Sequence, residues 1–379
     1  MPESRINFLT KISVLFWVYF VVTVVVSLQK YFLGAEDYGN YLIFKNSFLH
    51  LLSGKDLYAL YPELKIDLFK YSPTFSVLFS PFSFLPDIAG VIIWNLINAM
   101  LLFFAIRLMS MEERKKAYLL WFILIELITS LQNFQSNALT ASLMIFVFLM
   151  LERKNYLLAG ICVAIGFYIK VFGILAALLW VLYPGKGKFF FYSLASMIIL
   201  FSMPLIFISS SGLEGVYQSW FHLLSTDTVH ELNHSMMSIM KNWFGLEVNR
   251  TGVQATGLVL LSLPLMRWKY FLEKRFKLYF LCSILIASVI FNHKAESATY
   301  IIAVAGCAIW FFNSERTPLE ISLMVTLFLL TCLSPTDMFP KFVRENYIVP
   351  YSLKALPCIL IWVKIQYDLL SFRRTGAVS

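Results

Sequence analysis

The sequence has too few charged residues for an ordinary soluble protein. Only 14% of its 379 residues are Asp, Glu, Lys or Arg, whereas 59% are hydrophobic. Soluble domains keep roughly a quarter of their residues charged, because polar side chains must cover the surface. With a mean hydropathy of +0.73, much of this protein's surface must instead face lipid.

The sequence also lacks the motifs of several soluble enzyme classes. It has no GxGxxG turn, no Walker loop, no HExxH spacing and no room for a cytoplasmic catalytic domain. Its five cysteines all lie in apolar runs without a CxxC spacing, which is typical of inert packing thiols: Cys162, Cys282, Cys307, Cys332 and Cys358. We therefore expect no cofactor, no tightly bound catalytic metal and no nucleotide-binding fold.

Long apolar runs predict one all-α, polytopic membrane domain over residues 1–379. A spanning helix needs about 20 mostly apolar residues. The predicted spans are 9–29, 88–109, 117–131, 138–152, 155–170, 171–184, 188–209, 252–268, 277–292, 298–313, 317–334 and 351–368. The first run has a long apolar core and no small-residue cleavage site, so it is predicted to be an uncleaved span and not a signal peptide.

The distribution of basic residues predicts the orientation of these spans. The net charge is +9, but Lys and Arg occur in short clusters between apolar runs, which favours positive-inside bias over nucleic-acid binding. Placing the N-terminus in the cytoplasm puts most of these clusters in short inner loops. The prediction is twelve spans with both termini inside, and two large outer loops at 30–87 and 210–251.

The first outer loop is predicted to contain helices of its own. Residues 72–85 are apolar but too short for a span and are interrupted by Pro81. Counting them as a span would move the basic residues 114–116 to the outside, so we interpret them as a re-entrant or interfacial helix. Apolar residues recur at helical spacing from Tyr41 to Leu52, which predicts a second surface helix.

Four polar clusters fall at the outer membrane boundary in this topology. They are 36–38, 133–137, Lys170 and 292–296. A lysine with apolar neighbours, such as Lys170, must either snorkel to the surface or meet an anion, for example a phosphate. Glu126, inside a predicted span, is either a hydrogen-bond partner facing the bundle, the favoured reading, or part of a pathway.

An acidic group beside cations at a membrane surface suits sugar transfer from a phospholipid-like donor. A carboxylate can remove the proton of an attacking hydroxyl while Lys and His neutralise the leaving phosphate. All five histidines fall on the outer side in this topology, although solvated loop residues would do so too: His50, His222, His230, His234 and His293. On these grounds Lys170, His293 and Lys294 are expected to bind the donor phosphate, with His234 as a weaker candidate beside Asn233.

The order of several short motifs resembles glycosyltransferase family 87 of the GT-C superfamily, which includes polyprenyl-phosphate-mannose-dependent mannosyltransferases. The matching elements are Asp37-Tyr38 before a helix, Gly54-Lys55-Asp56-Leu57-Tyr58, Phe69-Lys70-Tyr71-Ser72-Pro73, Gln132-Asn133, the stretch from Ala159-Gly160 to Lys170, and His234-Ser235. Together they cover most of the chain. The sequence departs from the family pattern at two places. Members of the family often have two prolines after the tyrosine, where this chain has Ser72-Pro73. They often have Gly-Gln where this chain has Leu131-Gln132-Asn133.

The resemblance implies a GT-C bundle that moves a hexose, first of all mannose, from a polyprenyl-phosphate donor to a lipid-linked or glycan acceptor with inversion. It implies an active site on the outer face of a bacterial plasma membrane. Carried over, the catalytic acid falls on Asp37, with Glu36 or Glu296 as substitutes, although Asp37 could also merely cap the following helix. Tyr71 and Asn133 are further candidates for substrate binding.

A secondary transporter or flippase is the alternative function. Twelve spans with both termini inside is a common transporter layout, but transporters of this kind are built from internal repeats. Residues 1–185 and 186–379 show no such correspondence, and the long outer loop occurs once. The sequence therefore favours the glycosyltransferase.

Overall fold

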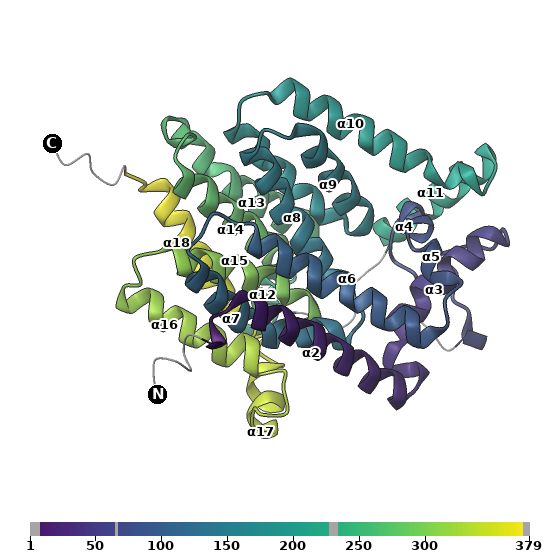
Figure 1. The fold of residues 1–379 in the computed structure, drawn as a ribbon, viewed down its shortest axis with the longest axis horizontal. Coiled ribbons are helices and arrows are strands. Elements are labelled where there is room, and N and C mark those ends of the chain that lie inside the picture. The colour runs from purple at the N-terminus through teal and green to yellow at the C-terminus, as the bar shows by residue number, and fades with distance from the viewer. Residues whose placement is uncertain (1–7, 65–66, 227–233, 374–379) are drawn as a thin grey trace.

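The computed structural model describes residues 8–64, 67–226 and 234–373, and over these residues it is helical with no strand. Its longer helices form a bundle (Figure 1). They are α2 (Ile12–Leu33), α6 (Asp87–Arg107), α7 (Glu113–Gln132), α8 (Asn137–Glu152), α9 (Tyr156–Ile169), the 3₁₀ helix η3 (Val171–Leu182), α10 (Lys186–Ser202) with η4 (Met203–Ile206), α13 (Arg250–Ser262) with η5 (Leu263–Tyr270), α14 (Lys274–Ile290), η6 (Ser297–Thr299) with α15 (Tyr300–Asn313), α16 (Pro318–Leu327) with the π-helix η7 (Phe328–Leu333), and α18 (Leu356–Leu370).

Shorter helices connect these bundle elements. They are η1 (Ala35–Tyr38), α3 (Gly39–Leu52), η2 (Pro62–Leu64), α4 (Pro73–Leu78), α5 (Ser80–Ser83), α11 (Ser210–Thr226), α12 (Met236–Phe244), α17 (Lys341–Val343) and η8 (Arg344–Ile348). Each of the twelve predicted spans falls on a helix of the bundle.

Three helices are long and apolar enough to cross a membrane: Ile12–Leu33, Asp87–Arg107 and Lys186–Ile206. Several central helices are shorter. The 16 residues of α8 rise by about 24 Å, and the 12 residues of η3 cover a similar distance because a 3₁₀ helix rises by about 2 Å per residue. Both fall short of the roughly 30 Å of a bilayer core. The chain is thus an all-helical membrane protein, and its twelve-span count stays a prediction.

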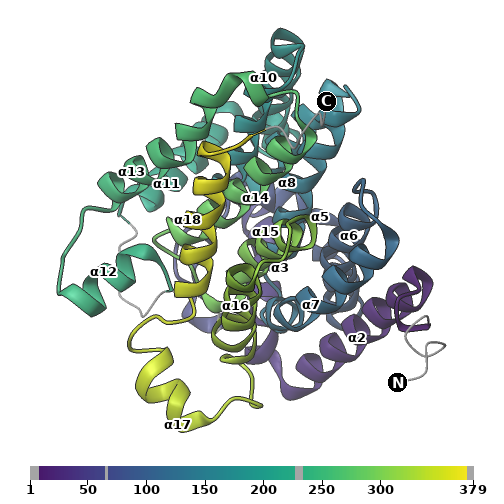
Figure 2. The same cartoon turned by 90° about the vertical axis from the view of Figure 1, so that its left-hand side faces the viewer.

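The basic turns that were predicted to face the cytoplasm lie together at one end of the bundle. Lys277, at the start of α14, pairs with Glu152 at the end of α8 at 2.9 Å. Arg267 donates to the carbonyl oxygens of Leu370 and Phe372 after α18. Figure 2 looks onto this end, where α2 begins and α18 ends. The helices of the first loop, α3 to α5, lie at the opposite end (Figure 1).

The first loop packs as an aromatic layer. The structure confirms a helix over residues 41–52, within α3, and forms 72–85 into the two short helices α4 and α5. The side chain of Ser72 accepts from the N–H of Phe75 and so caps α4, whereas Pro81 lies in the first turn of α5. The Phe44 ring lies 5.1 Å from that of Phe75 and 5.9 Å from that of Trp94, which ties this layer to α6.

A buried ion pair crosses the middle of the bundle. Glu126 of α7 accepts from the Lys354 ammonium at 2.9 Å, and the two side chains are 0% and 1% exposed. Lys354 also donates to the carbonyl oxygen of Thr331. This confirms the bundle-facing interpretation of Glu126, because an ion this deep in a bundle is tolerated only with a partner.

We predict that a cysteine at Ser110 will not be labelled by a membrane-impermeant thiol reagent in intact cells, whereas a cysteine at Ser53 will be. Both positions are exposed at helix ends, and positive-inside bias places them on opposite sides. Labelling is measured by gel shift before and after permeabilisation. If the thiol at 110 reacts in intact cells, residues 72–85 form a span and the bundle has thirteen.

Candidate active site

Three helical hairpins bring their turns to one place at the end of the bundle opposite the basic turns. Residues 133–136 join α7 to α8, Lys170 joins α9 to η3, and residues 291–299 join α14 to α15. The loop before α4 contributes a fourth segment. We call the side chains of Gln135, Lys170, Lys294 and Glu296 the Gln135 cluster.

The amide of Gln135 connects the three hairpins. Its Nε2 donates to Glu296 Oε2 in a short hydrogen bond. Its Oε1 accepts from Asn137 Nδ2 at 2.8 Å and lies 3.5 Å from Lys170 Nζ. Asn137 also donates to the carbonyl oxygen of Ala298 at 2.9 Å. One neutral side chain therefore joins a cation from one hairpin to a carboxylate from another.

The backbone around Lys170 is shaped by two glycines. A Cβ on Gly173 would lie 2.5 Å from the carbonyl oxygen of Gly166, so α9 and η3 approach closely only because this side chain is missing. Lys170 itself is extended, with φ −141° and ψ 120°. Its ammonium lies 5.7 Å from the centre of the Tyr71 ring and 5.9 Å from that of Phe172, within the range of cation–π attraction.

A second lysine, Lys294, lies on the other side of Glu296. Burial, and next the charge of Lys70, lower the pKa of Lys294 to about 8, although Glu296 and Asp67 act in the opposite direction. Lys70 in turn lies 3.5 Å from Asp67. The two lysines of the Gln135 cluster, with the neighbouring Lys70, thus bring positive charge from three separate segments of the chain.

Tyr71 lies at the edge of the Gln135 cluster. Its hydroxyl accepts from Ser136 Oγ at 3.3 Å, and its backbone carbonyl accepts from Tyr58 at 3.0 Å. The ring stacks on Phe75 at 4.6 Å. The structure therefore places Tyr71 beside Lys170, and both are candidate site residues from the sequence.

Asp37 lies beside the first half of the same 133–136 turn. It pairs with Lys30 at 2.6 Å, and its side chain is 34% exposed. The next residue, Tyr38, packs its ring 6.5 Å from that of Phe134, and Asn40 donates to the carbonyl oxygen of Asn133. Asp37 therefore lies next to the 133–136 turn, and the exposed Glu36 precedes it.

Phe134 adopts a strained backbone in this turn. Its φ is +50°, in the left-handed region that side chains seldom occupy. The ring is fully buried, and the carbonyl oxygen accepts from the indole of Trp94 at 2.8 Å. Burial of the ring and this hydrogen bond hold the turn in the conformation that presents Gln135.

The two candidate histidines behave differently from the lysines. Burial, and next the charge of Lys354, lower the pKa of His234 to about 4. Burial, and next the charge of Arg250, lower the pKa of His293 to about 4 as well. The ring nitrogens of His293 lie 3.4 Å from Arg250 Nη1 and 3.3 Å from Gln254 Nε2. Both imidazoles are neutral at pH 7, so they supply polar atoms and not positive charge. His230 and Asn233 lie outside the described residues.

The two histidines and Asn133 have different neighbours in the structure. The N–H of His234 donates to the carbonyl oxygen of Ala295 at 2.9 Å, which places it next to the Gln135 cluster. The contacts of His293 are with α13, away from Gln135. The side-chain amide of Asn133 donates to the carbonyl oxygen of Thr129 at 2.8 Å, so this side chain is hydrogen-bonded to the end of α7.

Several residues of the site were not singled out from the sequence. Lys70 precedes Tyr71 in a quoted motif, Asp67 was not mentioned, and Gln135 and Asn137 belong to a polar cluster that was noted as a whole. Among the described atoms, Asn137 Oδ1, Ser297 Oγ and His234 Nδ1 are buried without a hydrogen-bond partner. Such atoms are uncommon in folded proteins, and here they surround the Gln135 cluster.

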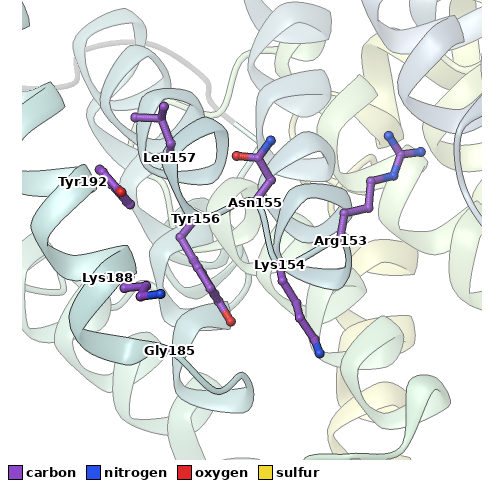
Figure 3. Close-up of a pocket in the computed structure, with 8 residues that line it drawn as sticks. All are labelled: Arg153, Lys154, Asn155, Tyr156, Leu157, Gly185, Lys188 and Tyr192. Atoms are coloured by element: carbon purple, nitrogen blue, oxygen red, sulfur yellow. The ribbon is translucent and has the colours of Figure 1, made fainter.

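A cavity also lies at the other end of the bundle. A groove of about 720 Å³ at the basic end of the bundle is lined by residues 153–157, Gly185, Lys188 and Tyr192 (Figure 3). No carboxylate lines it, so it offers no base for a hydroxyl. The Gln135 cluster, where the Glu296 carboxylate and two lysines meet, is therefore the candidate active site. Over the described residues, no group of three or more His, Cys, Asp or Glu side chains is placed to hold a metal ion.

Comparison with known proteins identifies one family. Residues 69–335, more than half of the chain, match the sequence model of glycosyltransferase family 87. This segment contains all four side chains of the Gln135 cluster, whereas Asp37 precedes it. No curated protein matches the chain.

We predict that Lys294 will titrate with a midpoint near pH 8. Competitive acetylation with a trace of acetic anhydride measures this, because only the neutral amine reacts. A lysine with a pKa of about 8 is half neutral at pH 8, against about 0.4% for an ordinary lysine near 10.4. The exposed Lys55 is the internal control. A midpoint for Lys294 as high as that of Lys55 would contradict the prediction.

Proposed function

The chain belongs to glycosyltransferase family 87, and from this membership we propose that it transfers a hexose from a polyprenyl-phosphate donor whose phosphate binds at the Gln135 cluster. Mannose is the first candidate for the hexose. The family membership sets aside the transporter and flippase alternatives. The observation that carries the proposal is the convergence of Lys170 and Lys294, from two separate hairpins, on one amide and one carboxylate.

Charge explains why a phosphate suits this place. Lys170 and Lys294, together with Lys70, offer positive charge at the boundary of a membrane, where a lysine without an anionic partner is costly. Glu296 is the carboxylate that Gln135 links to Lys170. A donor phosphate would compete with Glu296 for the lysines, and donation from several fixed cations would stabilise the leaving phosphate as charge develops on it.

The lengths of the helices support a donor that arrives from the bilayer. The turns of the Gln135 cluster follow or precede α8, α9 and η3, which have 16, 14 and 12 residues. These helices are shorter than the bilayer core is thick, so their ends can lie below the lipid headgroups. A polyprenyl tail would then lie among the helices while its phosphate reaches the lysines.

Asp37 is our proposed general base. Its carboxylate would take the proton of the acceptor hydroxyl as that oxygen forms a bond to the anomeric carbon. The bond from this carbon to the phosphate oxygen breaks at the same time, and the polyprenyl phosphate leaves with the bonding electrons. Inversion requires the base and the leaving group on opposite faces of the sugar. Asp37 would act on one face of the sugar, and the phosphate at the Gln135 cluster would leave from the other.

The proposed site faces the outside of the cell, where the acceptor is found. Positive-inside bias puts the Gln135 cluster outside the cytoplasm, and we place the protein in a bacterial plasma membrane. The acceptor would be a lipid-linked saccharide or another glycan whose hydroxyl reaches the site from the aqueous side. Asp37 and Lys30 are partly exposed, so an acceptor has access to them.

A transfer assay tests the proposal directly. The protein is purified, reconstituted in lipid, and incubated with radiolabelled polyprenyl-phosphate hexoses, one sugar at a time. The expected result is release of polyprenyl phosphate with transfer of the label to an added glycan, or with slow hydrolysis when no acceptor is present. Turnover of a nucleotide sugar alone would contradict the donor assignment.

We predict that Lys170→Met will weaken donor binding about 10-fold or more while the protein stays folded. Met keeps the apolar part of the side chain, so the loss reports the ammonium and not packing. Donor affinity is measured in nanodiscs, with Lys55→Met as the matched control because Lys55 is exposed in the first loop. Unchanged donor affinity in Lys170→Met would remove this residue from the site.

We predict that Asp37→Asn will reduce the turnover number about 100-fold or more, because Asn keeps the size of the side chain but cannot accept a proton. Asp37 caps neither η1 nor α3, so loss of a cap would not explain the result. Donor affinity should change little, since Asp37 does not contact the lysines of the Gln135 cluster. Glu296→Gln is the comparison variant and should change donor affinity more than turnover. The opposite pattern, with turnover lost in Glu296→Gln and retained in Asp37→Asn, would identify Glu296 as the base.

A further inference from the structure

The groove at the basic end of the bundle has features that neither the active site nor the topology requires. It holds about 720 Å³ between the α8–α9 turn and the start of α10. Lys154 and Lys188 lie on either side of Tyr156, and Arg153 extends away at the far edge (Figure 3). Tyr192 closes the groove on the α10 side. Its lining is therefore cationic and aromatic.

No carboxylate among the residues that the structure describes compensates the positive charge of this groove. The side chains of Arg153, Lys154 and Lys188 form no ion pair or hydrogen bond with any residue of the described chain. The adjacent carboxylate, Glu152, is engaged by Lys277 at 2.9 Å. Positive-inside bias explains why these residues are basic. It does not explain why three of them line one groove without a carboxylate partner.

Some basic residues at this end form ion pairs within the protein. Lys116 and Arg107 both contact Glu113 at 2.9 Å, and Arg275 lies 3.5 Å from Glu315. The groove gathers its cations around a hollow that no carboxylate lines, so an external anion would supply the counter-charge.

The helix ends beside the groove strengthen its positive potential. α9 and α10 both begin here and pack closely, because a Cβ on Gly160 would lie 2.7 Å from the backbone nitrogen of Ser193. The first turns of both helices contain no acidic residue, and α10 begins with Lys186. Cations at helix N-termini are unfavourable with respect to the helix dipole, and a bound anion relieves this repulsion.

The backbone of Lys154 also points to a role for its side chain. Its φ is +57°, in the left-handed conformation in which helices commonly end with glycine. Its N–H donates to the carbonyl oxygen of Leu151, and the N–H of Asn155 to that of Met150, which is the usual hydrogen bonding of such a helix end. A lysine here keeps its side chain despite a conformational cost that glycine would avoid.

The surface next to the groove is suited to a lipid. Lys188 and Tyr192 are four residues apart on α10, and Phe191 and Ile199 continue the same face with exposed fractions of 64% and 68%. From these features we propose that the groove binds the phosphate headgroup of an anionic phospholipid, with an acyl chain along this face of α10. Lys154 and Lys188 would pair with the phosphate and the tyrosine hydroxyls would donate to it.

Native mass spectrometry of the purified full chain tests this proposal with phosphatidylglycerol as the probe and phosphatidylcholine as the neutral comparison. The wild type should retain phosphatidylglycerol in preference, and the triple variant Arg153→Gln, Lys154→Gln, Lys188→Gln should bind it about 10-fold or more weakly. The matched control removes the same charge from exposed positions at this end, with Lys269→Gln, Lys274→Gln and Arg373→Gln. Equal losses in both variants would show general charge attraction and overturn the proposal.

Two further measurements complete the test. Excess inorganic phosphate should not displace the lipid from the wild type, and full displacement would identify a free-anion site instead. Lys154→Gly should raise thermal stability in neutral detergent, because glycine suits the left-handed backbone, and should lower phosphatidylglycerol affinity. If Lys154→Gly binds the lipid as tightly as the wild type, Lys154 does not contact the headgroup.

Discussion

The amide of Gln135 is the contact on which the active site depends, because it joins turns that the chain keeps far apart in sequence. Its two ends have opposite hydrogen-bonding character, so it can accept from Lys170 and donate to Glu296 at once. A charged side chain at this position would repel one of the two. Each partner sits in a turn between two packed helices, so the site inherits its geometry from the helix bundle. The buried pair of Glu126 and Lys354 adds a fixed link deeper in the same bundle, between α7 and the segment before α18.

Short helices and concentrated charge together give this end of the bundle its chemistry. The hairpins of this end are short, and their turns bury polar groups, between which electrostatic attraction is stronger than at an open surface. Lys294 shows the effect, since burial lowers its pKa to about 8 and leaves it charged at pH 7 but readily neutralised. His234 and His293 have lost their charge in the same surroundings. Lysines are therefore the cations that a phosphate would meet, which revises the role first expected for the histidines.

Much of the fold could be predicted from the sequence, because runs of apolar residues and breaks at charged or glycine-containing turns are local signals. All twelve predicted spans fall on helices, and the helix at 41–52 was also predicted. The site was harder to predict. Asn133 was selected within the right turn, but its neighbour Gln135 makes the contacts, since only the fold determines which side chain of a turn faces the other hairpins. Lys354 gave no signal, because its partner lies 228 residues away. The prediction of glycosyltransferase family 87 is confirmed by the match over residues 69–335, whereas the role of Asp37 still rests on position.

A cryo-electron microscopy structure of the protein with a non-transferable polyprenyl-phosphonate hexose would test the account most directly. We expect the phosphonate to lie within hydrogen-bonding distance of Lys170 and Lys294, with Glu296 released from at least one of its contacts and the sugar directed toward Asp37. The lipid tail should run between the short central helices. A phosphonate bound in the groove at the basic end, or one that contacts neither lysine of the Gln135 cluster, would contradict the assignment of the active site.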